Sequence, residues 1–519
     1  MFKYGIENFR RFKRTELIPL RRLNILVGRN SSGKSSYLRS LALISQSITT
    51  ATNGPILWWG DLVDFGSFSE AAHRDQKSSQ TITFKFGLDD LSFGDGIYIR
   101  MDSSYSSLRG QQKLDIEVNI TISQIESDHS GGKESHISRI ELLLPQFSIR
   151  SNIIIDRNNN ISQLDINQKD YTNIVRSANL YIQKDELFPR FEYTSPDQKR
   201  FDRLSGEETI IKLIAGAIHL YCHGKTQGQT RIQYALQLLS MGLFSKDELE
   251  SRYGKGGSRG FPNAVKNLRN ATESSVEELT ILTFLFHLPR IFHAFSVRMR
   301  SVFSEVFYIG PARVRSERYY RQQDLSVSKI SSDGTNFAMF LASLSSSALN
   351  EFSDAVSSLY GYQVRVHKEP GTSHISIMLN DNGFETNLID TGYGLSQILP
   401  VLAQVWWSRR RQPSRSNSLL AVEQPELHLH PAHQATLADA FIAFSGSSSA
   451  SQTSMIIETH SETMVNRFGE LVYQKLIGPD DIQILIFEDD DEKNTTRVRI
   501  ANFNDNGALV NWPFGFFGV

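Results

Sequence analysis

Residues 24–36 read NILVGRNSSGKSS, in which an apolar stretch runs directly into the pattern Gly28-x4-Gly33-Lys34-Ser35. This spacing is typical of a phosphate-binding loop, because small residues let successive backbone N–H groups curl around a chain of phosphates. The lysine then reaches the outer phosphate oxygens, and the serine binds Mg²⁺. A strand before the loop and a helix after it favour nucleotide binding over the alternative, an ordinary glycine turn. The residues expected to contact the nucleotide are Gly28, Asn30, Ser31, Ser32, Gly33, Lys34, Ser35 and Ser36.

Two apolar stretches in the second half of the chain lead to residues with reactive side chains. Residues 418–431 read SLLAVEQPELHLHP and predict a buried strand that ends at Glu423. A carboxylate at such a strand end completes the Mg²⁺ shell of an enzyme with a phosphate-binding loop. Residues 454–462 read SMIIETHSE and predict a second buried strand, which brings His460 to its tip. In an open α/β sheet, the carboxyl ends of the strands are where ligands bind.

A glycine-rich segment lies between the phosphate-binding loop and these two apolar stretches. Residues 390–402 read DTGYGLSQILPVL and predict a turn followed by a helix with one apolar face. We expect the helix to start, exposed, at Ser396, so that its free N–H groups and the flanking Gly392 and Gly394 form a second anion cradle. This cradle is far from the first one in the sequence.

The order of these motifs resembles that of the ABC-type ATPase heads of the RecF, Rad50 and overcoming-lysogenization-defect group. The opening, FKYGIENFRRFKRTELIPLRRLNILVGRNSSGKSS, is similar to the first strands of that group. The ending, NGALVNWPFGFFGV, is similar to a C-terminal signature of bacterial ATPases often encoded beside phage-defence nucleases, with the Septu-type ATPase subunits the nearest. The resemblance covers residues 1–90 and 300–519. It implies an α/β fold, an ABC-type P-loop ATPase head with an N-terminal mixed sheet and an inserted β-plus-helical arm.

The resemblance also implies roles for individual residues. Ser35 and Glu423 would bind the Mg²⁺ that accompanies ATP, Glu423 being the Walker B carboxylate. Gly394 and Ser396 are similar to the signature that closes over the nucleotide of a partner subunit. His460 resembles the switch histidine that senses the γ-phosphate.

Gln424 departs from the pattern of most ABC heads, in which the catalytic glutamate directly follows the Walker B carboxylate. An amide orients a water molecule by hydrogen bonding but cannot accept its proton, so general-base assistance is missing. Glu426, two residues further on, is the alternative base, or else it caps the next helix. We therefore expect slow ATP hydrolysis and a protein that stays bound to ATP for long periods.

The composition favours a soluble, cytoplasmic protein of two or three domains. The chain has 519 residues, of which 40% are hydrophobic. We find no apolar run of the ~20 residues that span a bilayer, and the charged N-terminus does not resemble a signal peptide. The single cysteine, Cys222, excludes an internal disulfide and is expected to be a buried apolar side chain rather than a reactive thiol. A net charge of −1 gives no general attraction to nucleic acid.

The spacing of hydrophobic residues predicts four regions. Residues 1–95 form the N-terminal part of the ATPase head, and residues 96–205 form a β-rich insert with alternating apolar positions. Residues 206–303 have a helical period and form a helical insert. Residues 304–519 return to the head with a strand at 304–308. Because no heptad pattern persists, we expect a compact arm and not a long coiled coil.

Three clusters allow more than one interpretation. The arginines from Arg313 to Arg321 interleave with tyrosines, which favours contact with nucleic acid or nucleotide as much as a solvated basic turn. The histidines of residues 428–433, HLHPAH, have a spacing near that of metal ligands, but structural or interface roles are favoured. Residues 488–492, EDDDE, could bind Mg²⁺ in a nuclease, but an acidic loop between two strands, exposed to water, is favoured.

We expect an ATPase head that forms a head-to-tail homodimer, or a higher even-numbered oligomer, around two ATP molecules. Its ATP-bound state would control a separately encoded effector, for which an HNH- or Toprim-type nuclease is the expected partner. Two alternatives from other classes stay open. One is an ATPase of DNA repair that binds DNA or its ends directly, and the other is a nuclease in its own right.

Overall fold

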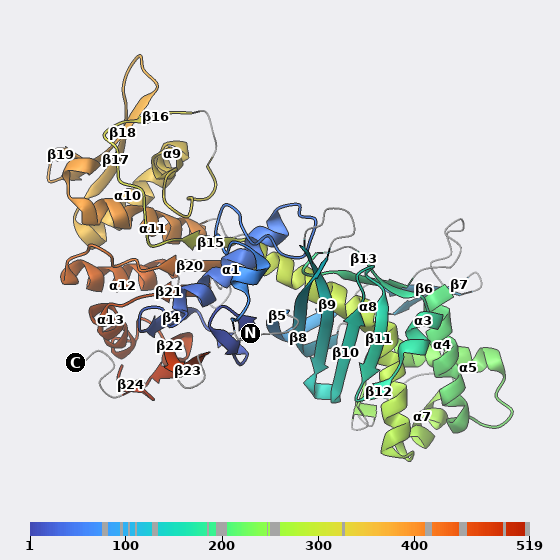
Figure 1. Cartoon of the computed structure of the whole chain (residues 1–519). Coiled ribbons are helices and arrows are strands. Elements are labelled where there is room, and N and C mark those ends of the chain that lie inside the picture. The colour runs from blue at the N-terminus through green and yellow to red at the C-terminus, as the bar shows by residue number, and fades with distance from the viewer. Residues whose placement is uncertain are drawn as a thin grey trace.

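The chain forms an elongated molecule with two lobes, and the N-terminus lies where the lobes meet (Figure 1). A seven-stranded sheet with its helices forms one lobe, and a nine-stranded sheet with a group of helices forms the other. The structure is a computed structural model, which describes residues 1–74, 81–93, 97–101, 104–108, 112–126, 133–183, 186–193, 205–245, 248–249, 260–323, 327–410, 418–445, 454–490 and 495–513.

The strand that precedes the phosphate-binding loop lies in the middle of the seven-stranded sheet. In spatial order the strands are β15 (Val306–Ile309), β20 (Leu419–Glu423), β21 (Ser454–Glu458), β4 (Leu23–Gly28), β22 (Ile482–Asp490), β23 (Thr495–Phe503) and β24 (Leu509–Val510). The first five are parallel, and β23 and β24 are antiparallel at one edge, so this is the mixed sheet of the protein. Strands β4, β20 and β21 are continuous apolar runs because helices cover them on both faces.

Helices cover this sheet with α1 (Lys34–Thr49) on one face and α11 (Tyr393–Arg410), α12 (Pro431–Ser445) and α13 (Glu462–Tyr473) on the other. Alternate residues of β4 show the two faces. Leu26 packs into the core that contains α1, whereas Ile25 and Val27 pack into the core that contains α11. The helix that follows the phosphate-binding loop and the helix that follows the glycine-rich turn therefore lie on opposite faces of one sheet.

A small subdomain covers the outer side of this lobe. Its elements are β16 (Tyr320–Arg321), α9 (Phe337–Ser343), α10 (Ser346–Tyr360), β17 (Gln363–Lys368), β18 (His374–Asp381) and β19 (Phe384–Asn387). Strands β17, β18 and β19 pair antiparallel, with a hairpin turn at Asp381-Asn382-Gly383 between β18 and β19. Asn382 and Gly383 both have positive φ, as this tight turn requires.

The nine-stranded sheet is antiparallel and crosses the boundary that was expected at residue 95. Its strands are β1 (Phe2–Phe9), β2 (Phe12–Arg14), β3 (Ile18–Leu20), β5 (Thr81–Phe93), β8 (Gln112–Glu126), β9 (Lys133–Leu144), β10 (Ile149–Ile155), β11 (Ile161–Ile166) and β12 (Lys169–Asp170). Strand β5, before the boundary, pairs with β8, after it, over most of its length. The N-terminal part of the head and the β-rich insert therefore share one sheet.

The remaining elements extend the second lobe. They are α2 (Phe68–Ala71), β6 (Ile97–Met101), β7 (Ser104–Leu108), α3 (Thr172–Ser177), β13 (Leu180–Gln183), β14 (Arg190–Tyr193), α4 (Ser205–Ile218), α5 (Gly228–Leu239), α7 (Phe261–Arg269) and α8 (Glu273–Ser304). From α4, which begins at Ser205, to the end of α8 the regular elements described are helices. Cys222 is only half-buried, and this partial burial raises the pKa of its thiol, which disfavours the reactive thiolate.

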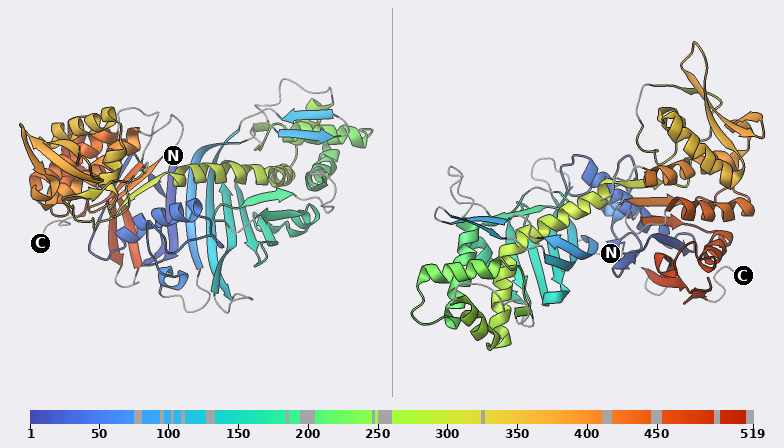
Figure 2. Two further views of the ribbon diagram at one scale, coloured as in Figure 1. Left: turned by 90° about the horizontal axis from the view of Figure 1, so that it is seen from above. Right: turned by 180° about the vertical axis from the view of Figure 1, so that it is seen from behind.

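Helix α8 connects the two lobes (Figure 2). It lies along the nine-stranded sheet, where the rings of Phe86, Phe188, Phe295 and Phe303 contact one another. At its end, Ser45 of α1 donates a hydrogen bond of 2.7 Å to the carbonyl oxygen of Phe303. By length and composition alone α8 could cross a membrane, contrary to the expectation that no such run exists. However, 72% of its most apolar window is buried inside the protein, as in a core helix.

We predict that His287, on α8, makes folding stability depend on pH. Burial lowers the pKa of His287 from 6.5 to about 3, and Nε2 lies 3.1 Å from the carbonyl oxygen of Leu239. The unfolded chain therefore binds more protons below pH 6.5, and the stability is lost as the pH falls from 6.5 towards 3. Between about pH 7.5 and about pH 5.5, wild type should lose about 1.4 kcal/mol of unfolding free energy relative to His287→Gln.

Urea unfolding at the two pH values measures this loss. The matched control is His219→Gln, which alters an exposed histidine on the same insert and should show the same pH dependence as wild type. A constant difference between wild type and His287→Gln across this range would contradict the prediction.

Candidate functional site

The phosphate-binding loop adopts a conformation that needs its glycines. A side chain at Gly28 would lie 2.5 Å from the carbonyl oxygen of Phe487, and Gly33 has a φ of 97°. Lys34 is 3% exposed and donates hydrogen bonds to the carbonyl oxygens of Gly28 and Arg29, at 3.0 and 2.8 Å. Burial lowers the pKa of Lys34, which nearby carboxylates partly offset. The loop thus encloses the ammonium group of Lys34, which is hydrogen-bonded to loop carbonyls and lies near carboxylates.

Two neighbouring hairpins hold the loop from outside. The hydroxyl of Thr496, on β23, donates to the carbonyl oxygen of Ser32 at 2.8 Å, and Arg11 donates to that of Ser31 at 3.1 Å. Arg11 also pairs with Asp489 at 3.2 Å. The two strands expected around the acidic segment are confirmed, but Asp489 is bound to this scaffold and is not freely exposed. Residues 491 and 492 of the segment lie outside the described residues.

Strands β20 and β21 end in a pair of carboxylates. Glu423 and Glu458 are direct neighbours in the register of the parallel strands, and they are 1% and 2% exposed. Glu458 was not among the expected site residues, although it ends the apolar stretch before Thr459 and His460. Glu458 lies beside Glu423 because of the register between β20 and β21, and this register cannot be read from the sequence alone.

Ser35 contacts Glu458 and not Glu423. Its hydroxyl donates to Oε1 of Glu458 at 2.9 Å, and Nζ of Lys34 lies 4.0 Å from the same oxygen. Oε2 of Glu458 is buried without a hydrogen-bond partner. Burial raises the pKa of Glu458 to about 7, and the neighbouring charge of Glu423 acts in the same direction. Glu458 therefore contacts Ser35 through Oε1, while Oε2 has no hydrogen-bond partner among the described residues.

Glu423 is held by two other side chains. Arg39, on α1, donates to both of its carboxylate oxygens, each at 2.7 Å. The hydroxyl of Tyr308 donates to Oε1 at 2.8 Å. The hydrogen bonds to Glu423 raise the pKa of Arg39. This bidentate pair fixes α1 to the end of β20.

Arg313 points into the site from the segment after β15. It is 5% exposed and donates to the carbonyl oxygen of Glu423 at 3.0 Å, while Nε and Nη1 are buried without partners. Burial lowers the pKa of Arg313 to about 10. The alternative of a solvated basic turn is therefore wrong for Arg313, because its side chain packs inward. Arg318 forms a bidentate pair with Asp390, and Arg321 is exposed.

Gln424, Glu426 and His460 meet at the same edge of the sheet. The N–H of Gln424 donates to the carbonyl oxygen of Glu458 at 2.8 Å, and its φ is 41°. Oε1 of Glu426 accepts from the N–H of His460 at 2.7 Å, while Oε2 is buried without a partner. One expectation was that Glu426 caps the next helix, α12. Its side chain instead accepts from the backbone of His460. Burial raises the pKa of Glu426, and partial burial and the charge of Lys34 lower that of His460.

The glycine-rich turn reaches this edge from the other face. Helix α11 begins at Tyr393, so Ser396 lies inside its first turn, 6% exposed, and donates to the carbonyl oxygen of Tyr393 at 2.8 Å. The expected exposed helix start at Ser396 is wrong by three residues. A side chain at Gly394 would lie 3.2 Å from the carbonyl oxygen of His428, so the turn packs closely on the loop after β20.

The histidines of residues 428–433 contact other groups individually. The ring of His428 meets that of Tyr393 edge-on at 4.9 Å, and His433 stacks on Tyr360 at 5.6 Å. Within the described part of the chain, no group of three or more His, Cys, Asp or Glu side chains is arranged to hold a metal ion.

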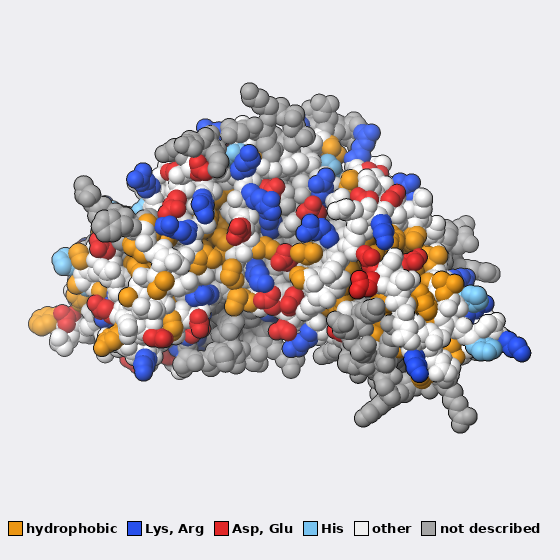
Figure 3. Space-filling view, turned by 90° about the horizontal axis from the view of Figure 1, so that it is seen from below, with side chains coloured by type: hydrophobic (Ala, Val, Ile, Leu, Met, Phe, Trp, Pro, Cys, Tyr) orange, Lys and Arg blue, Asp and Glu red, His pale blue; other side chains and the backbone are white. Residues whose placement is uncertain are grey.

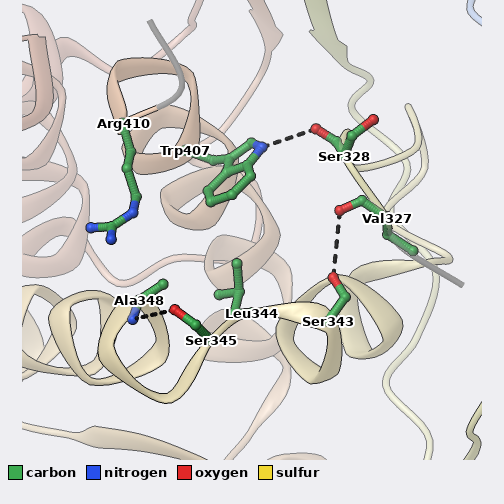
Figure 4. A pocket seen from close by; sticks show the side chains of 8 residues that line it. All are labelled: Val327, Ser328, Ser343, Leu344, Ser345, Ala348, Trp407 and Arg410. Atoms are coloured by element: carbon green, nitrogen blue, oxygen red, sulfur yellow. Dashed lines mark hydrogen bonds between the residues drawn. The ribbon is translucent and has the colours of Figure 1, made fainter. Parts of the chain in front are cut away.

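A separate pocket of about 300 Å³ lies at the far end of α11 (Figure 4). Nε1 of Trp407 donates to the carbonyl oxygen of Ser328 at 2.9 Å, and Arg410 pairs with Glu351. The hydroxyl of Ser345 accepts from the N–H of Ala348, as a helix cap. Because these polar groups have partners within the protein, we assign no chemistry to this pocket.

Comparison with known proteins gives one family and several structural likenesses. The AAA ATPase domain family matches residues 1–240 and 320–465, more than half of the chain. Among solved structures, the chain is similar to the Smc head domain with an extended coiled coil bound to the C-terminal domain of ScpA from Pyrococcus furiosus, at 14% identity over 97% of both chains, with a TM-score of 0.34.

Two further solved structures are similar to the chain. One is the SmcHead bound to the C-winged helix domain of ScpA, at 12% identity over 96% of this chain and 97% of that one, with a TM-score of 0.34. The other is the SMC head domain from Thermotoga maritima, at 9% identity over 96% of this chain and 97% of that one, with a TM-score of 0.31. No curated protein matches the sequence.

We predict that the pair of Arg39 and Glu423 stabilises the fold. Arg39→Met should lower the free energy of unfolding by about 2 kcal/mol, because it leaves the buried carboxylate of Glu423 without its bidentate donor. The double variant Arg39→Met/Glu423→Gln should recover much of this loss, since it removes the buried charge. Arg14→Met, at an arginine side chain that is 77% exposed, is the control and should change stability by less than about 0.5 kcal/mol. Urea unfolding measures the free energy of unfolding of Arg39→Met, Glu423→Gln and the double variant. A loss in the double variant equal to the sum of the two single losses would contradict the pairing.

Proposed function

The chain belongs to the AAA ATPase domain family, and we propose that it acts as a slow ATP-dependent switch. ATP and Mg²⁺ bind at the loop of residues 28–36, and ATP binding brings two copies together as a homodimer. The ATP-bound dimer then controls a separately encoded nuclease in the defence of a bacterial cytoplasm against phage. The observation that carries this proposal is the joint position of Lys34, Ser35 and two buried carboxylates at one edge of the sheet.

The residues of the loop fit a magnesium–nucleotide complex. The hydroxyl of Ser32 and Oε2 of Glu458 are buried without hydrogen-bond partners. Lys34 donates only to two loop carbonyls, which it can exchange for phosphate oxygens. Ser35, together with a carboxylate at this edge of the sheet, would hold Mg²⁺, which neutralises the charge that develops on the phosphates. His460 would contact the γ-phosphate from the tip of β21.

The two faces of the sheet support a dimer. Because the sheet separates α1 from α11, the turn with Gly394 and Ser396 lies on the side opposite the helix that follows the phosphate-binding loop. A second copy, placed head to tail, would bring its turn over the first nucleotide. In support of a signature role, Ser396 lies in the first turn of a long helix, where free N–H groups favour anions.

Slow hydrolysis follows from the residue beside Glu423. The amide of Gln424 can orient a water molecule but cannot take its proton. Glu426 is the alternative base, since one of its oxygens is fixed by His460 and the other is free. ATP would thus stay bound long enough for its presence, and not its turnover, to set the state of the dimer.

The role in defence rests on the resemblance of the ending, residues 506–519, of which 514–519 lie outside the described residues. A surface that mixes basic and acidic side chains, on the face shown in Figure 3, suits a regulator that contacts a protein better than one that contacts nucleic acid. The effector is therefore proposed as an HNH- or Toprim-type nuclease that binds this ATPase.

We predict that Lys34→Ala weakens ATP binding. The loss of a charge-assisted hydrogen bond should lower affinity by roughly 10 to 100-fold, because such a bond contributes about 1.5–3 kcal/mol. Isothermal titration with ATP measures the change. Lys13→Ala, which removes an exposed lysine of the adjacent strand β2, is the control and should bind as wild type does. Equal affinity in Lys34→Ala would remove the assignment of the loop.

We also predict that Gln424→Glu accelerates hydrolysis. General-base assistance contributes roughly 10² to 10⁴-fold, so a carboxylate at this position should raise the rate of phosphate release well above that of wild type. Glu426→Gln is measured beside it under the same conditions. Brisk wild-type hydrolysis that is lost only in Glu426→Gln would show that Glu426 is the base and that the protein is not a slow switch.

A further inference from the structure

We infer that the carboxylate that serves the Mg²⁺ of the bound nucleotide is Glu458, and that Glu423 is a structural anchor. This inference rests on the ATP binding proposed above, and it moves a role that the sequence assigned to β20 onto the neighbouring strand β21. Glu458 would accept the ion together with the hydroxyl of Ser35. Glu423 would keep its place in an ion pair through the nucleotide cycle.

The first support is the position of Ser35. In a phosphate-binding loop this hydroxyl is a metal ligand, so the carboxylate it touches lies beside the metal position. Ser35 touches Glu458 at 2.9 Å. Oε2 of Glu458 is buried and has no hydrogen-bond partner among the residues that the structure describes, so it is free to accept a ligand without losing a hydrogen bond there.

The second support is the spacing of α1 against the two strands. Ser35 and Arg39 are four residues apart and therefore lie on one face of α1, about 5–6 Å from each other. Neighbouring strands are about 4.8 Å apart, so the two side chains face the ends of β21 and β20 respectively. Ser35 meets Glu458 and Arg39 meets Glu423, one partner for each carboxylate.

The third support is that both oxygens of Glu423 already accept hydrogen bonds from other side chains. Oε2 accepts from Arg39, and Oε1 accepts from both Arg39 and Tyr308. Glu423 is 1% exposed, so turning it towards a metal would break its bidentate pair with the half-buried Arg39 and leave the buried hydroxyl of Tyr308 unpaired. Strand β21 is also the direct neighbour of β4, whereas β20 is one strand further from the phosphate-binding loop.

The test measures metal binding by the full chain and does not depend on turnover. ATP affinity is determined with Mg²⁺ and with a chelator, and Mn²⁺ in the ATP complex is observed by electron paramagnetic resonance. Glu458→Gln should bind ATP in chelator at least as tightly as wild type, yet lose the enhancement by Mg²⁺ about tenfold or more, with loss of the bound Mn²⁺ signal. Glu423→Gln should keep both the enhancement and the signal.

Three outcomes would overturn the inference: enhancement retained in Glu458→Gln, enhancement lost in Glu423→Gln, or equal loss in both variants. If Glu423→Gln does not fold, Arg39→Met/Glu423→Gln replaces it, because that variant removes both charges of the ion pair. Wild-type protein that fails to bind ATP even with Mg²⁺ would contradict the proposed function itself. By contrast, if wild type binds ATP and Mg²⁺ enhances this binding equally in wild type and in Glu458→Gln, only the inference about Glu458 fails.

Discussion

The balance of charge around two buried carboxylates, Glu423 and Glu458, determines how the site is built. Like charges at adjacent strand ends raise one another's energy, and burial adds a desolvation cost to each. Arg39 of α1 offsets the charge of Glu423, and Lys34 lies near Glu458. Arg313 arrives from the end of β15 and binds the same strand end. The need to offset two buried negative charges thereby fixes α1, the phosphate-binding loop and the segment after β15 at one edge of the sheet.

Glu426 extends this network to the next loop. Its side chain accepts from the backbone of His460, so the loop after β20 is joined to the tip of β21. Gln424 forms a second link between the same two segments through its own backbone N–H. The residues proposed to act on the nucleotide therefore lie on short, doubly attached segments, which keeps their positions precise relative to the strands.

Local patterns in the sequence were enough to locate the phosphate-binding loop and the strands ending at Glu423 and before His460. The missed features depend on contacts between distant segments. Glu458 becomes a neighbour of Glu423 only through the pairing of two strands about 35 residues apart, and Arg313 has the same sequence surroundings whether it points inward or outward. Helix α11 begins at Tyr393 and not at Ser396, and Gly394 packs against the loop of His428, a contact that has no local signal in the sequence.

Helix α8 is a single long element that connects α1 in one lobe to the nine-stranded sheet of the other lobe. At 32 residues it is up to about 48 Å long, and one end is bonded to α1 while the rest lies along the nine-stranded sheet. A rotation of about 5° transmitted through α1 would displace the far end of a helix of this length by roughly 4 Å. In the switch proposed above, a small movement of α1 would therefore become larger at the far end of α8, on the second lobe, where a bound protein would register it as a change in shape.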